Sequence, residues 1–404
     1  MAELLIRAAA NDAALLRRLY GLGGGGRAAA TPSRIVVDAH TPVGGSEIPA
    51  IARRAGVPLL IDPQTFYLQD RQHPEDKWAR LPFADPARLT PGELRRPERR
   101  QAVIERSIDH QLTHGATAII PPYVHLENAA SEWIAVQAEL WRATRRYLDD
   151  SGLALPVTAV FALGWRLLHP VQGPNALAPA LSALDVLAPA EVALATSKVG
   201  AGVKPADRLT DLILMIGRLR PKYPVLAWQQ GILGQTCVVA GAAGYETGIG
   251  WREKCDLQSK MAEHRQPPSL GGPGPRPVYV HALGHSVPAK TVAALQPHRS
   301  LWRAVLCTDQ RCCPPAGAAM LHDARAHAVV SRALSLAQLD TIPQAVWRWH
   351  HLADQADAAV GLAGKINRTA ATESGIGRVD LRPLTAIQTV AHLRRHDGRF
   401  RKVA

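Results

Sequence analysis

Two carboxylate residues stand at the ends of short apolar segments, where side chains can take part in catalysis. Asp62 ends the segment Leu59–Asp62, and Glu246 lies inside the glycine-bounded segment Gly244–Gly248. Glycines leave room for a ligand to approach the backbone closely. Because paired carboxylates can supply a nucleophile and a general acid/base to one substrate, we predict that Asp62 and Glu246 are catalytic.

Both carboxylates also have structural interpretations. Asp62 could cap the turn at Pro63, and Glu246 could form a structural ion pair with Lys198 or Arg166. Lys198 follows another apolar segment. A lysine whose pKa is lowered by burial or by a neighbouring cation could instead form a Schiff base with a carbonyl substrate.

Polar and aromatic side chains also follow the other apolar segments. Such groups are costly to bury at one end of a sheet unless they are paired or used in binding. We therefore predict a substrate site there, in which aromatic rings stack on a flat base. The predicted substrate-binding residues are Asp38, His40, Gln64, Phe66, Tyr123, His125, Trp165, Lys198, Trp228, Gln229, His281 and His285.

Eight short apolar segments would position these residues. Most of the segments are separated by stretches with a helical pattern, and eight strand–helix units are the number found in a (β/α)8 barrel. We therefore predict an α/β fold, a (β/α)8 TIM barrel, with its site at the carboxyl ends of the strands. The segments are 34–38, 59–62, 116–121, 157–162, 192–197, 225–229, 244–248 and 278–284.

The chain is predicted to have three parts. Residues 1–33 form an N-terminal helix and linker, residues 34–315 form the barrel, and residues 316–404 form a helical C-terminal segment with a basic tail. A long polar insertion at 68–100 follows the second strand. It is a candidate lid or partner-binding loop, or alternatively a solvated insertion.

The composition is that of a large, basic chain. It has 404 residues and a net charge of +13. A basic protein commonly meets nucleic acid, so tRNA or DNA is the expected partner. An arginine-rich proteome from a GC-rich genome would give the same charge. The predicted nucleic-acid contacts are Arg95, Arg96, Arg99, Arg100, Arg394 and Arg395.

Several classes of protein are disfavoured by the same sequence. No apolar run reaches the 18 or more residues of a membrane span, so no membrane contact is expected. The N-terminus lacks the pattern of a secretory signal. Five cysteines do not suggest a disulfide framework, so a reducing cytoplasm is the expected location. A homodimer and a larger assembly both remain open.

A cysteine cluster follows the predicted barrel. Cys307, Cys312 and Cys313 lie upstream of His327. Three cysteines and a histidine can hold a structural zinc ion. Adjacent cysteines rarely ligate one ion together, so a metal-free cluster is the alternative.

The order of these features resembles the tRNA-guanine transglycosylase-like superfamily, barrel enzymes that exchange guanine or deazaguanine bases in tRNA or DNA. In that family an apolar strand ends in Asp-Ser-Gly-Gly-Phe-Gln. Residues 58–66 read Pro-Leu-Leu-Ile-Asp-Pro-Gln-Thr-Phe, with Asp62 and Phe66 in the matching places. Glu246 takes the place of the family's late nucleophilic carboxylate, and 307–327 takes the place of its cysteine-containing segment.

The resemblance implies a glycosyltransferase in which Glu246 attacks the glycosidic carbon and Asp62 serves as acid/base or holds the incoming base. Two alternatives remain. One is a small-molecule lyase or aldolase that uses Lys198. The other is a non-catalytic barrel that binds nucleic acid within a larger assembly.

Overall fold

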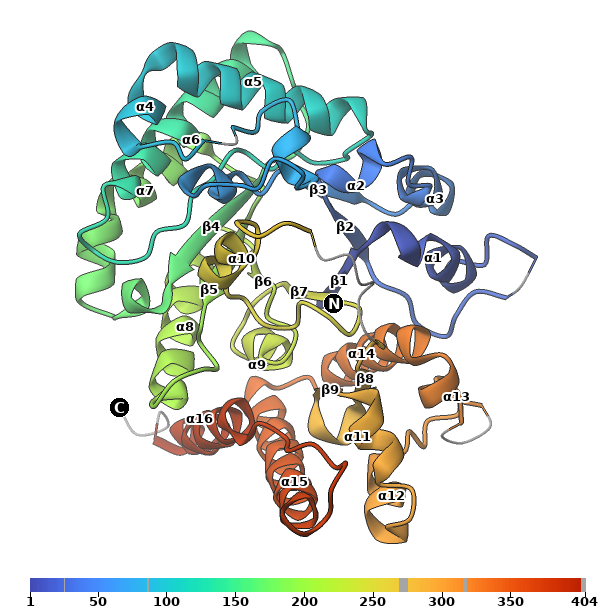
Figure 1. Ribbon diagram of the computed structural model, residues 1–404. Coiled ribbons are helices and arrows are strands. Elements are labelled where there is room, and N and C mark those ends of the chain that lie inside the picture. Colours follow the sequence, from blue (N-terminus) through green and yellow to red (C-terminus); the bar gives the residue numbers. More distant parts are fainter. Residues whose placement is uncertain (25, 86, 269–274, 315–317, 401–404) are drawn as a thin grey trace.

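Seven parallel strands form the central sheet of the computed structural model, which describes residues 1–404 except 25, 86, 269–274, 315–317 and 401–404 (Figure 1). The strand order is β3-β2-β1-β7-β6-β5-β4, and the sheet is curled. The strands are almost entirely buried, as expected for a parallel sheet covered by other elements. Their bounds are β1 Glu3–Ala8, β2 Arg34–Asp38, β3 Leu59–Asp62, β4 Thr158–Gly164, β5 Glu191–Ser197, β6 Val225–Trp228 and β7 Gly244–Gly248.

Strand β1 corrects the predicted N-terminal boundary. The sequence predicts only a helix and linker in residues 1–33, whereas Glu3–Ala8 pair with β2 on one side and β7 on the other. Just three apolar residues, Leu4–Ile6, stand between Glu3 and Arg7. This short run at a chain end looks like an exposed terminus, although it forms the middle of the sheet. The predicted helix is present as α1 (Ala13–Leu19).

The predicted third strand, 116–121, is an irregular segment that hydrogen-bonds to both edge strands. The Thr117 N–H donates to the Leu59 carbonyl of β3 at 2.9 Å. On the other side, the Thr158 N–H of β4 donates to the Ile119 carbonyl at 2.9 Å. This segment therefore connects the two edges of the curled sheet.

The predicted eighth strand, 278–284, is wrong. Strand β8 (Val278–Val280) pairs antiparallel with β9 (His285–Val287) in a separate two-stranded sheet. The 3₁₀ helix η5 (His281–Leu283) and Gly284, with φ +67°, reverse the chain between them. The apolar run is thus a hairpin arm, and β1 occupies the place beside β7 in the main sheet.

Helices surround the sheet (Figure 1). Those up to β7 include the long amphipathic helices α5, α6 and α8, which bury one face each. The bounds are α2 His40–Val43, α3 Ile48–Ala55, α4 Pro91–Arg95, α5 Pro97–Thr113, α6 Trp133–Asp150, α7 Gln172–Leu187, α8 Pro205–Leu219 and α9 Gly234–Val239, with 3₁₀ helices η1 Ala10–Asp12, η2 Thr65–Gln69, η3 Trp78–Arg80 and η4 Trp165–Leu168.

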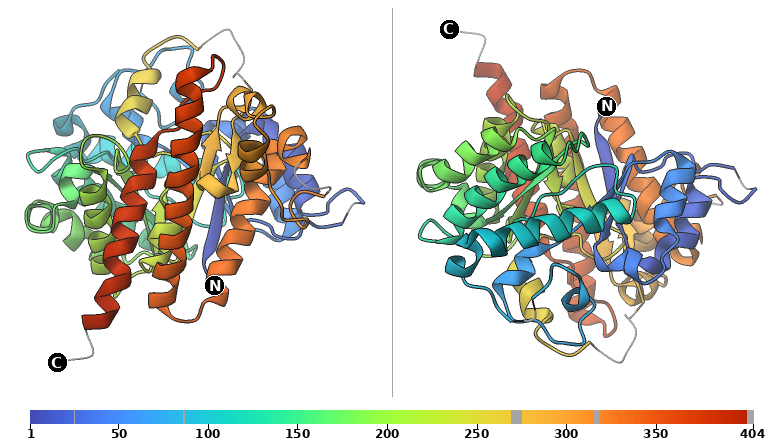
Figure 2. Two further views of the ribbon diagram at one scale, coloured as in Figure 1. Left: turned by 90° about the horizontal axis from the view of Figure 1, so that it is seen from below. Right: turned by 90° about the horizontal axis from the view of Figure 1, so that it is seen from above.

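The C-terminal part packs below the sheet in Figure 1 and has a second hydrophobic core of its own. Its two longest helices, α15 and α16, lie side by side (Figure 2). Helix α10 (Leu257–Glu263) does not belong to this part, since it lies over the sheet (Figure 1). The bounds of the C-terminal helices are α11 Ala289–Ala294, α12 Arg299–Val305, α13 Ala318–His322, α14 Ala324–Thr341, α15 Ala345–Thr372 and α16 Leu381–Phe400.

The 68–100 insertion is anchored to the main core. Trp78 is fully buried, and its indole Nε1–H donates to the Pro63 carbonyl at 2.9 Å. The insertion therefore packs over the end of β3 and is not a fully solvated loop. Residue 86 within it lies outside the described residues.

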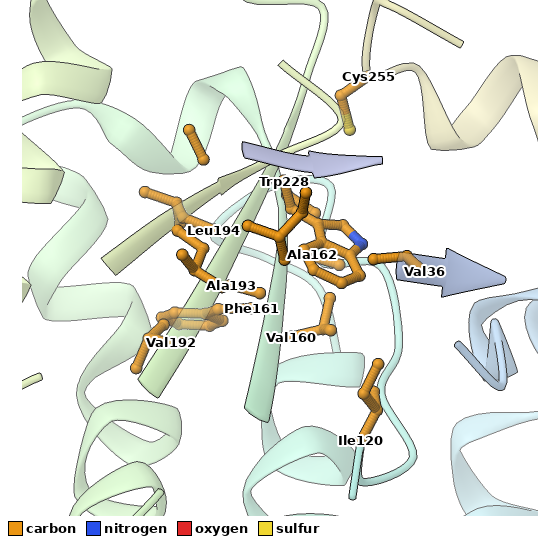
Figure 3. Packing of buried hydrophobic residues seen from close by; sticks show 14 of the residues in the cluster. Val36, Ile120, Val160, Phe161, Ala162, Val192, Ala193, Leu194, Trp228 and Cys255 are labelled. Carbon is orange, nitrogen blue, oxygen red and sulfur yellow. The ribbon is translucent and has the colours of Figure 1, made fainter. Parts of the chain in front are cut away.

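The main core joins all seven strands. Figure 3 shows part of this packing, with Val36 from β2, Val160 from β4, Leu194 from β5 and Trp228 from β6. Among the described helices, none is both long and apolar enough to cross a membrane.

Candidate active site

A buried guanidinium from β1 gathers three carboxylates at the carboxyl ends of the strands. Arg7 donates from Nε to Glu246 Oε1 at 2.9 Å. Its Nη1 donates to Asp38 Oδ1 at 2.6 Å, and its Nη2 donates to Asp62 Oδ2 at 2.8 Å. The structure thus brings together the carboxylates predicted from strands β2, β3 and β7, and Arg7 is the partner that sequence reasoning missed.

The cluster is sealed from solvent and electrostatically balanced. Asp62 and Glu246 are both 0% exposed. Burial alone would lower the pKa of Arg7, but the three carboxylates raise it above its ordinary value. Burial alone would raise the pKa of Asp38, but Arg252 and Arg7 hold it well below its usual range. Charged groups tolerate such burial only when they are paired in this way.

Each proposed catalytic carboxylate has a second partner. The Gln229 backbone N–H donates to Glu246 Oε2 at 2.8 Å, from a residue held in the left-handed conformation (φ +56°). The Tyr123 hydroxyl donates to Asp62 Oδ1 at 2.8 Å. Both oxygens of each carboxylate are therefore oriented. The Glu246 pairing with Lys198 or Arg166 considered from the sequence is wrong, because Arg7 takes that place.

Asp62 also fits its structural interpretation in part. Its Oδ1 accepts a hydrogen bond from the Gln64 N–H at 3.0 Å, so it does cap the turn after β3. Gln64 adopts φ +50° in this turn. Phe66 follows in this turn, and its ring packs against Tyr123 of a later segment, with centroids 5.8 Å apart and both residues buried. The turn therefore places the predicted aromatic residues beside the carboxylate.

A lysine that the sequence did not suggest lies in the mouth, by which we mean the opening at the carboxyl ends of the strands around the Arg7 cluster. Lys260, on α10, donates from Nζ to the side-chain oxygen of Gln229. Burial, and after it the nearby Arg252 and Arg7, lowers the pKa of Lys260 to about 8. Only its place on the covering helix gives it this environment, so the sequence held no local signal for it.

Lys198, in contrast, has its partners outside the Arg7 cluster. Its Nζ donates to Gln258 Oε1 at 2.8 Å and lies 3.7 Å from Asp256 Oδ1. Its backbone is left-handed, with φ +62°. Lys198 therefore does not join Asp62 and Glu246 around Arg7, and its role in substrate binding stays a prediction.

Helix α10 covers the ends of β5 and β6. The Leu257 N–H at its start donates to the Ser197 hydroxyl at 3.2 Å. Beyond its end, the His264 carbonyl accepts a hydrogen bond from the His73 N–H at 2.9 Å, and Arg265 pairs with Asp70 at 2.5 Å. The 68–100 insertion thus holds α10 across the mouth.

Several buried donors in the mouth lack partners. Within the described part of the chain, no hydrogen bond is made by His40 Nδ1, Trp228 Nε1 or Gln229 Nε2. Trp228 also lies under the Arg7 guanidinium, 5.4 Å from the ring centroid. Unsatisfied buried polar atoms are rare in folded proteins, and these three atoms could hydrogen-bond to a polar ligand.

Of the remaining residues predicted to bind substrate, some lie at the mouth and others lie elsewhere. His125 lies at the mouth, 3.3 Å from the Ser197 hydroxyl, and burial lowers its pKa to about 4. Trp165 lies on η4, with the Arg208 guanidinium 3.8 Å from its ring centroid. His281 and His285 belong to the β8–β9 hairpin, so the expectation that they line this mouth is wrong. His281 instead lines a separate, mainly apolar cavity of about 550 Å³ beside α15.

The six predicted nucleic-acid arginines occupy two separate regions (Figure 1). Arg95, Arg96, Arg99 and Arg100 lie on or beside α4 and α5, where Arg99 pairs with Asp85 and Arg100 pairs with Glu139. Arg394 and Arg395 lie on α16, at the opposite end of the molecule. Of the expected basic tail, 401–404 lie outside the described residues. The six arginines therefore do not form one continuous surface, and their contact with nucleic acid stays a prediction.

The cysteine cluster comes together as a possible metal centre. One ligand atom from each of Cys307, Cys312, Cys313 and His327 lies within 4.8 Å of the others. The Sγ atoms of Cys312 and Cys313 are 3.8 Å apart, about the 3.8 Å separation of two thiolates on a tetrahedral zinc ion. His327 Nε2 lies 2.7 Å from the Tyr279 carbonyl, so its N–H donates there and Nδ1 faces the sulfurs.

One of the three thiols is shifted toward the thiolate form. A hydrogen bond with Cys312, with a further contribution from His327, lowers the pKa of Cys307 to about 4, whereas the hydrogen bond with Cys307 raises the pKa of Cys312 and burial raises that of Cys313. Thiolate is the form that binds zinc. The donor set therefore fits a closed structural site, and the adjacency of two cysteines does not prevent both sulfurs from facing it.

Comparisons with known proteins identify no family. No family model and no curated protein matches the chain. Among solved structures, a GH18 chitinase from Pseudoalteromonas aurantia aligns with 65% of this chain and 100% of its own, with a TM-score of 0.38 and 8% identity. A likeness this distant carries no argument about the site.

Proposed function

We propose that this protein is a transglycosylase-like enzyme that exchanges a nucleobase in tRNA or DNA. The observation that carries the proposal is the convergence of Asp62 and Glu246 on the single guanidinium of Arg7. Two carboxylates fixed at one point can divide the work of a retaining displacement. The net charge of +13 supports a polyanionic substrate.

In the first half-reaction, a Glu246 oxygen attacks the sugar carbon that carries the base. The new C–O bond forms as the C–N bond breaks, and the electron pair of that bond leaves with the base, which takes up a proton from water. In the second half-reaction, the nitrogen of the incoming base attacks the same carbon and releases Glu246. Asp62 holds the incoming base and accepts its N–H proton. The configuration at the carbon is retained because displacement occurs twice.

The mouth also has groups to hold an extruded base. Phe66, Tyr123 and Trp228 offer aromatic faces, and the unpartnered Gln229 Nε2 can donate to a base carbonyl. Because Asp62 and Glu246 are covered, α10 must move before a base can enter. The structure described here corresponds to the closed form in this proposal.

The fold and the cysteine cluster support the same proposal. We infer a full (β/α)8 barrel in which 116–121 serves as the strand between β3 and β4, since it hydrogen-bonds to both. Cys307, Cys312, Cys313 and His327 would hold zinc, which would fix the β8–β9 hairpin against α14 and take no part in the chemistry.

Incorporation of labelled guanine or a deazaguanine into tRNA and DNA tests the proposal. The wild-type protein should transfer label to one of them, and Glu246→Gln should reduce the rate by at least about 10³-fold because the nucleophile is lost. Glu47→Gln, in an exposed pair with Arg17, is the matched control and should keep full activity. Absence of label in both nucleic acids, with either base, would contradict the proposal.

Lys260 favours a second candidate, a lyase or aldolase that forms a Schiff base with a carbonyl substrate. Its pKa of about 8 gives a substantial neutral fraction near physiological pH. The amine would add to the carbonyl, and water would leave. Borohydride trapping with candidate carbonyl compounds should then label Lys260 and not Lys198. Turnover of such a compound without any trapped Lys260 adduct would eliminate this candidate.

A further inference from the structure

A second cavity lies beside the loop that follows β7. It has a volume of about 380 Å³ and is walled by the loop after β7, by β9 and by the residues just before α16. Trp251, Arg252, Lys254, His285 and Arg378 contribute to its lining. Arg252 also pairs with Asp38, so this one side chain links the cavity to the Arg7 cluster.

A tight turn after β7 directs the side chains of Trp251 and Arg252 to different places. The Gly248 N–H donates to the Arg252 carbonyl at 3.3 Å, and a Cβ at position 248 would lie 1.9 Å from the Trp251 carbonyl oxygen. Arg252 has φ +59°, a strained conformation for a residue with a side chain. The turn directs Arg252 to Asp38 while Trp251 keeps 41% of its surface exposed.

The cavity also has unneutralised positive charge. Arg378 is exposed and forms no ion pair with any described residue. The acidic residues in the lining are already engaged, since Glu253 pairs with Arg332 and Asp380 pairs with Lys254 and Arg382. An anionic group of a ligand would therefore find Arg378 available.

A buried histidine offers an unused hydrogen-bond acceptor in the same lining. His285 is 7% exposed, and its Nδ1 lies 3.0 Å from the Ser286 carbonyl, which can only accept. Burial lowers the pKa of His285 and so favours the neutral ring, in which Nε2 carries a lone pair. Within the described residues, that Nε2 has no hydrogen-bond partner.

We propose that this cavity binds the nucleotide adjacent to the one that reacts. The base of that nucleotide stacks on Trp251, its phosphate pairs with Arg378, and a sugar hydroxyl, where the strand is RNA, donates to His285 Nε2. Since Arg252 reaches from the cavity to Asp38, neighbouring nucleotides of one strand would lie in the cavity and the mouth. This inference rests on the proposed function, because it takes the partner to be nucleic acid.

Binding of short labelled single strands to the full-length protein tests the inference. Fluorescence anisotropy with matched ribo- and deoxyribo-oligonucleotides should show that Trp251→Ala weakens binding by about 5- to 100-fold, since a stacked base is lost. Trp251→Phe should restore most of the affinity. Arg378→Gln should weaken binding. It should also reduce the slope of the logarithm of the binding constant against the logarithm of the salt concentration by about one, because one phosphate contact is lost.

Two surface variants serve as controls. Trp347→Ala removes a tryptophan that is 57% exposed on α15, and Arg303→Gln removes an exposed arginine on α12. Neither should change the affinity. Unchanged binding by Trp251→Ala, equal losses in the controls, or no binding by the wild-type protein would overturn the inference. If the wild-type protein prefers RNA and His285→Phe abolishes that preference, the sugar hydroxyl contacts His285. Equal affinities of the wild-type protein for RNA and DNA would show that the cavity binds the base and the phosphate alone.

The guanine-exchange assay separates this inference from the proposed function. Strand binding that depends on Trp251 but brings no base exchange would refute the proposed function and support the cavity assignment. Base exchange whose kcat/KM is unchanged in Trp251→Ala would refute the cavity assignment and leave the proposed function intact.

Discussion

Arg7 is the residue on which the site depends. It lies between three carboxylates that come from strands far apart in sequence, and all four side chains are nearly or fully buried. Three carboxylates at one place would repel one another strongly without a shared cation. Arg7 therefore offsets their mutual repulsion and fixes their positions, and a nucleophile and an acid/base partner need such fixed positions.

Replacement of Arg7 should be severely destabilising. We expect Arg7→Gln to lower the free energy of unfolding by about 3–5 kcal/mol, because buried carboxylates lose their partner. Arg7→Lys, which keeps the charge, should lose less. Arg17→Gln breaks an exposed pair with Glu47 and should cost at most about 1 kcal/mol in the same urea titration. An Arg7→Gln loss no larger than that of Arg17→Gln would contradict the assigned role.

Lys260 should titrate near neutrality. Its pKa of about 8 lies below the ordinary value of about 10.4 for an unfolded chain. The unfolded state therefore binds the proton more tightly, and this residue should make the free energy of unfolding rise between about pH 8 and pH 10. Amine acylation followed by peptide mass spectrometry should show half-maximal labelling of Lys260 near pH 8. A labelling midpoint near pH 10, or a rise in stability that persists in Lys260→Met, would contradict the lowered pKa of Lys260.

Among the secondary-structure elements, α10 decides whether the site is open. It covers the ends of β5 and β6 and is held by the 68–100 insertion through the His73–His264 and Asp70–Arg265 contacts. The latter pair is largely exposed and individually weak. Such an element is suited to open locally while the sheet remains folded.

Weakening this attachment should loosen α10 selectively. In Arg265→Gln, hydrogen exchange of 257–266 should accelerate by up to about 5-fold, because one surface ion pair is lost. Exchange in β5 and β6 should not change. Arg311→Gln removes another exposed ion pair, with Asp309, and should leave α10 unaffected. Equal acceleration of hydrogen exchange in the sheet, or no acceleration in α10, would contradict the assignment of α10 as the element that opens the site.

The same elements show what the sequence could predict. Six of the eight apolar segments form strands of the main sheet, and residues placed at strand ends, such as Asp38, Asp62 and Glu246, do meet. Strand β1 could not be recognised because its apolar run is short and ends in Arg7, which looks like a surface residue. Lys260 was equally hidden, since a lysine on an amphipathic helix gives no sign that its helix folds back over the mouth.

For the whole molecule, the main question is how the C-terminal part is attached to the sheet. It has a separate core, and the cysteine cluster joins the segment after α12 to α14 beside the β8–β9 hairpin. A metal ion there would link these segments and stabilise the folded chain. The basic groups, in contrast, are dispersed, so affinity for a polyanion would come from the cavity and mouth more than from α4, α5 or α16.

Metal analysis should detect about one zinc ion per chain, as expected for one closed site. Cys313→Ser should lose the metal and lower the melting temperature, because the link between the hairpin and α14 is broken. Cys237→Ser is the control, since that buried thiol lies in α9, away from the cluster. Full stability after removal of the metal by a chelator would show that the cluster has no structural role.

A covalent bond between Glu246 and the nucleic acid is the most decisive observation available. The protein would be incubated with tRNA or DNA in the absence of an incoming base, denatured, digested and examined by mass spectrometry. We expect a glycosyl adduct on Glu246 that disappears when guanine is added and never forms in Glu246→Gln. Base exchange without any adduct, or an adduct on Asp38 or Asp62 instead, would contradict the assignment of Glu246 as the nucleophile.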